Sequence, residues 1–341
     1  MKSLSRRIFI KQSGILATAF VMPLSYNSIL NKKGMSDKEH FDVIIIGGSY
    51  SGLAAAMALG RALRKVLIID SGKHCNRQTP YSHNFLTQDG KAPKEIATLA
   101  KQQVSVYNTV EQYDDLVIHV SKTQNGFIIQ TFSEAMFTAT KLVFATGIKD
   151  EMPNIKGFSE CWGISVLHCP YCHGYEVKNE TTAIMGNSDY GFEFAKLISN
   201  WTKDLTLLTN GKSSLDTVQI ENLARHNIEV VEKEIEELES VSGQLQSIIF
   251  KDGTKKIIKA IYTRLPFEQH CQLPEQLGCE LTKDGYIKID TSHKTTINGI
   301  YACGDNVTRL RTVATAVAMG TTTGMMVNKE LVEEKFTIKN K

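Results

Sequence analysis

The sequence predicts an α/β protein with two Rossmann-like dinucleotide-binding domains. A strand-like apolar run, a glycine-bearing turn, a helix-like stretch and a second strand follow one another twice, over residues 42–70 and again over residues 182–208. This order is typical of the βαβ unit that binds dinucleotides. The length of 341 residues suits about two domains, and 42% hydrophobic with 22% charged residues is ordinary globular composition.

The first unit carries the residue types that a dinucleotide needs. The apolar run 42–46 breaks into the turn 47–52, and the second apolar run ends in an acidic residue. Such a turn lets the backbone approach a pyrophosphate at a helix N-terminus, while the acid accepts hydrogen bonds from ribose hydroxyls. Serine replaces the middle glycine of the motif, so a purely structural turn remains the alternative. The candidate cofactor-binding residues are Gly47, Gly48, Ser49, Gly52 and Asp70.

The second unit has the same order but lacks part of the nucleotide signature. Its strands are expected at Thr182–Met185 and Leu205–Leu208, and its candidate nicotinamide-nucleotide loop contains Gly186, Ser188 and Gly191. No acid and no arginine cluster follows the second strand, so neither a ribose acceptor nor a clamp for a 2′-phosphate is evident. Binding of NAD(P)H is therefore doubtful.

Other segments are less distinctive. The stretches 142–147 and 299–305 are expected to be apolar strands. Their ends supply further candidate cofactor-binding residues, which are Ala145, Thr146 and Gly147 in the first and Gly304 and Asp305 in the second. Mixed strands and helices are expected between residues 211 and 280. Within them, the charged, amphipathic stretch 231–240 is expected to form a solvated face.

The N-terminal segment 1–35 differs from the rest of the chain. It holds six basic side chains and no acidic one, so the net charge of +3 leaves −3 on the remaining residues, and no basic stripe there suggests a nucleic-acid partner. Arg6 and Arg7 precede a short apolar core at 14–24, a pattern that resembles a twin-arginine export signal. The pattern predicts a periplasmic protein or one on the outer face of the inner membrane, with a membrane tether if the leader is not cleaved. A cytoplasmic protein that starts at Met35 is the alternative.

The stretch 168–174, HCPYCHG, is the chemical centre of the sequence. Cys169 and Cys172 are spaced for an internal disulfide, and redox use is favoured over a metal site, which would need two further ligands, and over two inert cysteines. Lowering a thiol pKa from ~8.5 to ~6 raises its thiolate fraction at pH 7 about 30-fold but reduces intrinsic nucleophilicity about 13-fold. A neighbouring histidine is therefore more useful for moving a proton to or from sulfur. His173 is the first candidate for this role and His168 the second, with a surface or capping role as the alternative for each.

The remaining cysteines and histidines give weaker signals. His83 and His270 stand in unusual loop-like contexts and are minor candidates. The other five cysteines are expected to be packing residues: Cys75, Cys161, Cys271, Cys279 and Cys303.

Residues 41–335 resemble the thioredoxin reductase-like flavoproteins in the order of their motifs. These motifs are the first glycine turn, the Ala-Thr-Gly strand end, the Cys-x-x-Cys pair and the late Gly-Asp. The resemblance implies FAD, held by the first unit together with Asp305, and places Arg311 and Thr312 near the isoalloxazine. It also implies a discontinuous FAD domain at 41–155 and 265–335, with a domain at 156–264 that carries the cysteine pair, and a homodimer.

Within that family, HCPYCHGYE and SHNFLTQDG look more like a subgroup that includes the dithiol oxidases of gliotoxin and holomycin formation. The resemblance implies that Cys172 faces the flavin and Cys169 exchanges with substrate. The favoured function is oxidation of a small-molecule dithiol by FAD, with oxygen or another acceptor. An NAD(P)H-dependent reductase of a thioredoxin-like protein or small disulfide is the main alternative, and a non-enzymatic flavin redox sensor is the minor one.

Overall fold

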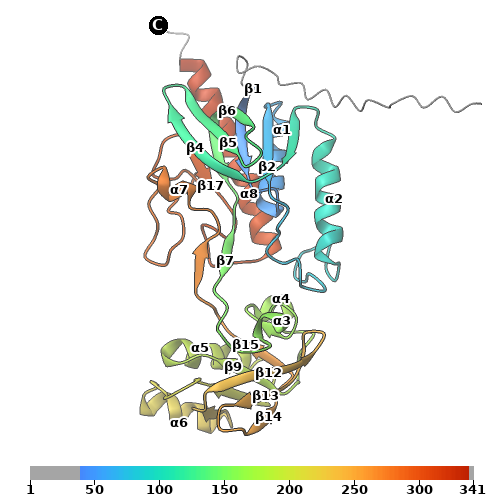
Figure 1. Cartoon of the computed structure of the whole chain (residues 1–341), viewed down its shortest axis with the longest axis vertical. Coiled ribbons are helices and arrows are strands. Elements are labelled where there is room, and N and C mark those ends of the chain that lie inside the picture. The colour runs from blue at the N-terminus through green and yellow to red at the C-terminus, as the bar shows by residue number, and fades with distance from the viewer. Residues whose placement is uncertain (1–38, 338–341) are drawn as a thin grey trace, which may run out of the picture. The chain divides into compact units, whose positions relative to one another are not determined.

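The first βαβ unit is part of a seven-stranded sheet in the computed structural model, which describes residues 39–337 (Figure 1). The strand order is β3-β2-β1-β6-β5-β4, and β17 pairs with β6. Strands β1, β2, β3, β6 and β17 run parallel, while β4 and β5 form an antiparallel extension. The bounds are β1 Glu39–Ile46, β2 Val66–Asp70, β3 Val110–Asp114, β4 Val117–Thr123, β5 Gly126–Thr131, β6 Met136–Phe144 and β17 Ile300–Ala302.

Helices α1 (Tyr50–Arg61), α2 (Pro93–Ser105) and α8 (Val313–Thr337) complete this part of the fold. Helix α8 packs directly on α1, and two glycines of α8 make the close approach feasible. A Cβ atom on Gly320 would lie 2.0 Å from the carbonyl oxygen of Ser51, and one on Gly324 would lie 2.6 Å from that of Ala55. The C-terminal helix is thereby fixed beside the helix that follows the first glycine turn.

The second βαβ unit forms a separate five-stranded parallel sheet of order β11-β10-β9-β15-β8. The chain passes to it through β7 and returns through β16, and these two short strands pair with each other antiparallel. An antiparallel sheet of β12, β13 and β14 packs its inner face into a shared apolar core. The strands are β7 Ile148–Asp150, β8 Val166–Leu167, β9 Thr182–Met185, β10 Leu205–Leu208, β11 Glu229–Val231, β12 Ile235–Val241, β13 Gln244–Phe250, β14 Lys255–Ile257, β15 Ala260–Tyr262 and β16 Phe267–Gln269. The remaining helices are α3 Phe158–Cys161, α4 Pro170–His173, α5 Ser188–Ile198, α6 Thr217–Arg225 and α7 Leu273–Gln276.

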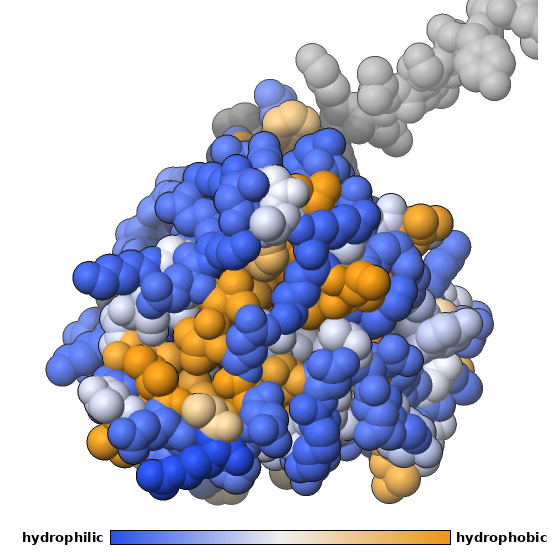
Figure 2. All heavy atoms as spheres, turned by 90° about the horizontal axis from the view of Figure 1, so that it is seen from below, coloured by the Kyte–Doolittle hydropathy of each residue, from blue (hydrophilic) through white to orange (hydrophobic). Residues whose placement is uncertain are grey.

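The expectation for residues 231–240 is only partly correct. The glutamates are solvated as expected, but most of this stretch is strand β12, and Ile235 and Leu238 are buried in the core. A register shift between Ile235 and Glu237 brings these two apolar residues to one face despite their spacing of three. Figure 2 shows apolar side chains among charged ones on the face seen from below. The exposed apolar residues of α6, β12 and β14 are Val218, Ile220, Val241 and Ile257.

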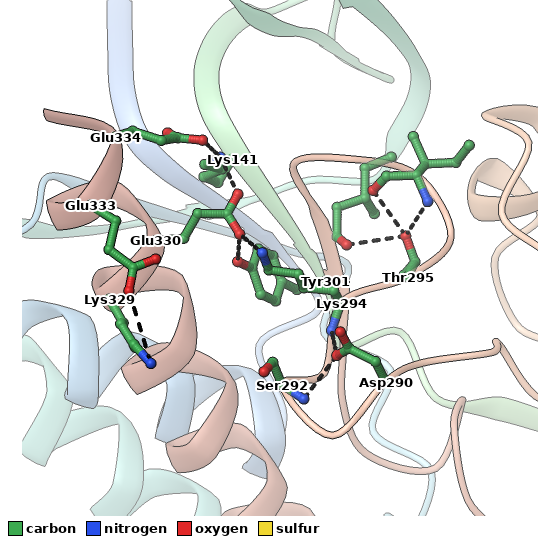
Figure 3. Close-up of polar contacts among 12 residues, drawn as sticks. Lys141, Asp290, Ser292, Lys294, Thr295, Tyr301, Lys329, Glu330, Glu333 and Glu334 are labelled. Carbon is green, nitrogen blue, oxygen red and sulfur yellow. Dashed lines mark hydrogen bonds and ion pairs between the residues drawn. The ribbon is translucent and has the colours of Figure 1, made fainter. Parts of the chain in front are cut away.

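A buried ionic cluster anchors the C-terminal half of α8 to the first sheet (Figure 3). Glu330 of α8 accepts a hydrogen bond of 2.5 Å from Lys141 of β6 and one of 2.6 Å from the Tyr301 hydroxyl of β17. Lys294 also pairs with Glu330, and Lys141 pairs with Glu334 at 2.6 Å. Burial alone would raise the pKa of Glu330, but these hydrogen bonds outweigh it and lower the pKa to about 2. The carboxylate therefore stays ionised.

The predicted α/β class with Rossmann-type sheets is confirmed. The leader, its twin arginines and the alternative start at Met35 lie outside the described residues. Among residues 39–337 no helix is both long enough and apolar enough to span a membrane.

Candidate functional site

The first glycine turn brings three backbone segments into contact. The backbone at Gly47 has φ +105°, and a Cβ there would lie 2.3 Å from the carbonyl oxygen of Ala145. A Cβ on Gly52 would lie 1.9 Å from the carbonyl oxygen of Gly47, and one on Gly48 would lie 2.9 Å from the Asp70 Cβ. These positions accept only glycine, as the sequence motif predicts.

This turn opens into a cleft of about 960 Å³. Ser49 is the N-cap of α1 but its side chain makes no capping hydrogen bond, so the first N–H groups of the helix are available to a ligand. One carboxylate oxygen of Asp70 is buried without a hydrogen-bond partner. Both features fit the phosphates and ribose of a dinucleotide. Nine of the predicted cofactor residues line the cleft: Gly47, Ser49, Asp70, Ala145, Thr146, Gly147, Asp305, Arg311 and Thr312.

The other predicted cofactor residues shape the backbone around the cleft rather than line it. Gly304 has φ +89°, and a Cβ there would lie 2.5 Å from the Ser51 hydroxyl. Strand β6 ends at Phe144, so Ala145, Thr146 and Gly147 form the loop after the strand. The expected strand end at Gly147 is thus three residues too late, because these residues turn away from the sheet into the cleft.

Arg311 is held at the cleft by two carboxylates. It donates two hydrogen bonds of 2.8 Å to Asp150, and its Nε lies 3.7 Å from Asp305. Burial raises the pKa of Asp305 to about 6, against the opposing charge of Arg311. Sequence reasoning missed Asp150, because its partner Arg311 is 161 residues away. No motif in the sequence marks this position.

The cysteine pair sits at the start of the four-residue helix α4. Cys169 is its N-cap, Pro170 is its first residue and Cys172 lies within the turn, where its N–H donates to the carbonyl of Cys169 at 3.3 Å. Both residues are free thiols. A hydrogen bond with Cys172 lowers the pKa of Cys169 despite burial, and the backbone N–H groups of Cys172 and Tyr171 lower it further. The same hydrogen bond, burial and the charges of Cys169 and Asp305 raise the pKa of Cys172.

The two flanking histidines are neutral at pH 7. Burial lowers the pKa of His168 to about 4, with help from the charges of Arg311 and His173. Burial also lowers the pKa of His173 to about 4, with a contribution from the charge of His83. His168 lines the cofactor cleft and its Nε2 is buried without a partner. A neutral imidazole has one unprotonated ring nitrogen, which can accept a proton. Both histidines are therefore proton acceptors in this state.

One of the cysteines expected to be packing residues does not pack. Cys75 is exposed, lines the cofactor cleft and lies 3.9 Å from a guanidinium nitrogen of Arg311. The expectation is wrong for Cys75, because the loop after β2 runs along the open cleft rather than through the core. Cys161, Cys279 and Cys303 are buried as expected. Cys271 is half-buried. It packs against the apolar core of the seven-stranded sheet and also lines the cleft.

The loop of the second βαβ unit is filled by its own side chains. Asn187, the N-cap of α5, accepts hydrogen bonds from the backbone N–H groups of Ser188 and Ser214 and donates one of 2.9 Å to the carbonyl of Lys212. A Cβ on Gly186 would lie 3.0 Å from the Tyr190 ring, which is therefore packed against the glycine.

Charge also opposes a phosphate at this helix. Asp189 puts a carboxylate in the first turn of α5, and Gln219 holds it with a hydrogen bond of 2.7 Å. A pyrophosphate in that position would meet a fixed negative charge. Gly186, Ser188 and Gly191 thus form the predicted turn, but its surroundings do not fit a nicotinamide nucleotide. Tyr190, Asn187 and Asp189 are the residues that sequence reasoning missed here.

A dinucleotide cleft beside a cysteine pair defines the site of a flavin-dependent disulfide oxidoreductase. The chain belongs to the pyridine nucleotide-disulphide oxidoreductase family, whose family model matches residues 41–320. The resemblance to the thioredoxin reductase-like enzymes is confirmed, and such enzymes depend on FAD, with NADPH as the usual electron donor.

Three similar proteins illustrate the relationship. The thioredoxin reductase tcpT of Claviceps purpurea is 29% identical over 88% of this chain and 97% of its own length. The crystal structure of a putative thioredoxin reductase TrxB from Bacillus anthracis has a TM-score of 0.83 at 31% identity, covering 86% of this chain and 99% of that one. The crystal structure of HlmI has a TM-score of 0.82 at 29% identity, covering 88% and 95%. The chain is therefore an enzyme that acts on sulfur groups, which removes the non-enzymatic alternative.

Proposed function

We propose that this enzyme oxidises a small-molecule dithiol to a disulfide, passing the electrons through Cys169 and Cys172 to FAD and on to oxygen or another acceptor. The observation that carries the proposal is the second nucleotide loop, where Asn187 closes the turn with its own hydrogen bonds, the Tyr190 ring packs on the first glycine and Asp189 puts a carboxylate in the first turn of α5. An enzyme that draws its electrons from a thiol substrate does not require that loop to bind a nucleotide.

The residues of the first cleft would hold FAD by its phosphates and ribose, at the α1 N-terminus and Asp70. When bound, the flavin supplies two-electron acceptance and reoxidation. The exchange itself belongs to the cysteines. A substrate thiol loses its proton and bonds to the Cys169 sulfur of the oxidised pair, the Cys169–Cys172 bond breaks, and its electron pair stays on the Cys172 sulfur. His173 takes the proton. A second substrate thiol then attacks its own sulfur in the mixed disulfide, which releases Cys169.

The protonation states are compatible with this direction. Dithiol oxidation needs groups that accept protons from attacking thiols, and His173 and His168 are neutral at pH 7. Burial lowers their pKa values to about 4, which makes them weaker bases than a solvated histidine. The backbone N–H groups at the start of α4 stabilise negative charge on Cys169 when it leaves the mixed disulfide. A reductase would instead begin from a protonated acid beside the pair.

The rival function is an NAD(P)H-dependent reductase of a thioredoxin-like protein or small disulfide. One observation favours it: a smaller cavity of about 440 Å³ lies at the carboxyl ends of β9, β10 and β15, lined in part by Gly186, Asn210 and Arg264. The Arg264 guanidinium is engaged by the rings of Tyr190 and Phe194, at 5.3 and 5.5 Å from their centroids. That engagement makes it a poor phosphate clamp.

Anaerobic stopped-flow mixing decides between the two functions. The FAD-loaded enzyme is mixed separately with dithiothreitol, NADH and NADPH, and the flavin absorbance is followed. We expect bleaching by the dithiol and none within the same time by either nicotinamide. Cys172→Ser should abolish the bleaching, while Cys279→Ser, the same exchange at a buried cysteine elsewhere, should preserve it. Bleaching by NADPH but not by the dithiol would show a reductase instead.

We also propose that the protein is exported by the twin-arginine route and acts as a homodimer. The leader pattern at residues 5–24 supports export, and that route carries folded proteins, which suits a chain that must enclose FAD first. Likeness to thioredoxin reductase-like enzymes, which are often dimeric, supports the second copy. Fractionation of cells that express the full chain, and light scattering of the purified enzyme, test the two parts separately.

A further inference from the structure

An aromatic side chain is exposed on the turn that carries the cysteine pair. Helix α4 begins after Cys169, and the Cys172 N–H donates to the Cys169 carbonyl at 3.3 Å, so both cysteines belong to a single turn. Of the two residues between them, Pro170 is buried, whereas Tyr171 is 63% exposed. Consecutive Cα atoms are 3.8 Å apart, so the Cα of Tyr171 lies within about 7.6 Å of that of Cys169. Tyr171 is therefore the residue between the cysteines that faces solvent.

Trp201 holds the Tyr171 ring in place. The two rings meet edge to face, with centroids 5.6 Å apart and an interplanar angle of 87°. Trp201 follows α5, and its N–H donates to the carbonyl of Ile198 at 2.9 Å while its carbonyl accepts from the N–H of Asn179 at 3.0 Å. An edge-to-face aromatic pair is a preferred arrangement, so this contact favours one orientation of the tyrosine ring.

The Trp201 side chain also packs on the residue that ends the turn. A Cβ on Gly174 would lie 2.5 Å from Trp201 Nε1 and 2.4 Å from the carbonyl oxygen of Pro170. Only glycine leaves room for the indole ring at this position. Trp201 is half-buried and thus supports Tyr171 from the protein side, while most of the tyrosine remains open to solvent.

A tyrosine that is exposed and already oriented is well suited to bind an apolar ligand. Tyrosine offers a large contact area with only two side-chain torsions to fix, and its contact with Trp201 reduces the entropy that binding would cost. Tyr171 does not line the cofactor cleft, whereas the neighbouring His168 does. The exposed ring is therefore available to a molecule other than FAD.

We propose that Tyr171, supported by Trp201, contacts the carbon skeleton of the substrate while a substrate thiol bonds to Cys169, and that it favours small-molecule dithiols with a planar unsaturated ring. This inference rests on the proposed dithiol exchange and specifies the class of dithiol. A planar ring can stack on the tyrosine or meet it edge to face, and a short hydroxylated dithiol has no such surface. Tyr171 is a specificity-determining residue, because it acts on substrate affinity and not on the electrons or protons of the exchange.

Two dithiols that close disulfide rings of the same size test the inference. Benzene-1,2-dimethanethiol carries an aromatic ring, whereas dithiothreitol carries hydroxyl groups. The oxidised, FAD-loaded enzyme is mixed anaerobically with increasing concentrations of each dithiol. Reduction of the Cys169–Cys172 disulfide is followed by quenched alkylation and mass spectrometry, and flavin bleaching is recorded in parallel. Each series gives a half-saturating concentration and a limiting rate.

The variants are Tyr171→Ala and Tyr171→Phe, with Phe132→Ala as the matched control. Phe132 is 73% exposed, lies in the turn between β5 and β6, and does not line the cleft. FAD content and the unfolding midpoint of each variant establish that it is folded.

We expect Tyr171→Ala to raise the half-saturating concentration of the aromatic dithiol about 2- to 12-fold. An aromatic contact is worth about 0.5–1.5 kcal/mol, and 1.4 kcal/mol corresponds to tenfold. The limiting rate with this dithiol and both constants for dithiothreitol should stay as in the parent enzyme. Tyr171→Phe keeps the ring and should match the parent, as should Phe132→Ala.

Two results overturn the inference. One is an unchanged half-saturating concentration of the aromatic dithiol in Tyr171→Ala. The other is an equal rise for both dithiols, since that result identifies a change at Cys169 itself and not a contact with the substrate ring. If the dithiols reduce the cysteine pair of the parent enzyme but do not bleach its flavin, the proposed dithiol oxidation fails. The alkylation measurements still decide the inference about Tyr171 in that case.

Discussion

Replacing Glu330 with glutamine should destabilise the enzyme without changing the geometry of its site. The Glu330 side chain is 10% exposed and neutralises Lys141, which is 4% exposed, while also binding Tyr301 and Lys294. Removing one partner of a buried ion pair costs about 3–5 kcal/mol because the other charge remains buried. Lys141 keeps a second partner, Glu334, which is 42% exposed. We therefore expect the low end of that range, about 3 kcal/mol, which corresponds to a fall in the thermal midpoint of roughly 5 °C for a protein of this size.

The neighbouring Glu333 provides the matched control. It lies on the same helix, is 64% exposed and pairs with Lys329 at 3.9 Å (Figure 3). Glu333→Gln should change stability by less than about 0.5 kcal/mol. The free energy of unfolding is measured in urea at pH 7 with excess FAD, so that cofactor loss does not contribute. Equal effects of Glu330→Gln and Glu333→Gln would refute the reasoning, since they would mean that burial of the cluster has no energetic consequence.

Three further predictions follow from the site and the cluster. Gly52→Ala places a Cβ 1.9 Å from a backbone oxygen, so FAD affinity measured by fluorescence titration should fall about 5- to 150-fold for a cost of about 1–3 kcal/mol. Gly253→Ala strains a backbone of φ +79° between β13 and β14, outside the residues that line the cleft, and should bind FAD like the parent. His168 and His173 bind fewer protons in the folded than in the unfolded state, because their pKa values are lowered on folding. The free energy of unfolding in urea should therefore fall as the pH drops from 6.5 toward 4. The double variant His168→Gln/His173→Gln should lose this pH dependence. Glu330 has a lowered pKa, so its contribution is complete above its unfolded pKa of ~4.3 and is lost as pH falls from there toward 2, a loss that Glu330→Gln should lack.

The sequence was sufficient to predict those parts of the fold that depend on neighbouring residues. Apolar runs and glycine spacing located both βαβ units, and the bounds of the strands Thr182–Met185 and Leu205–Leu208 agree with the prediction. The pairing of β17 with β6 joins segments that are far apart in the chain, and only the family resemblance implied it. Spacing alone also could not show the register shift in β12, because a bulge depends on the partner strand.

The same distinction applies to the site. The cysteine pair and the glycines around Gly47 were recognisable because their chemistry resides in short motifs. The clamp of Arg311 by Asp150 and the position of Cys75 in the cleft arise from contacts over more than 150 residues, for which a single sequence offers no signal. Tyr190 could have been noticed in the sequence, since a bulky residue inside a phosphate loop is itself unusual. Its packing on Gly186 could not be predicted, because the ring also contacts Arg264, which is far away in the sequence.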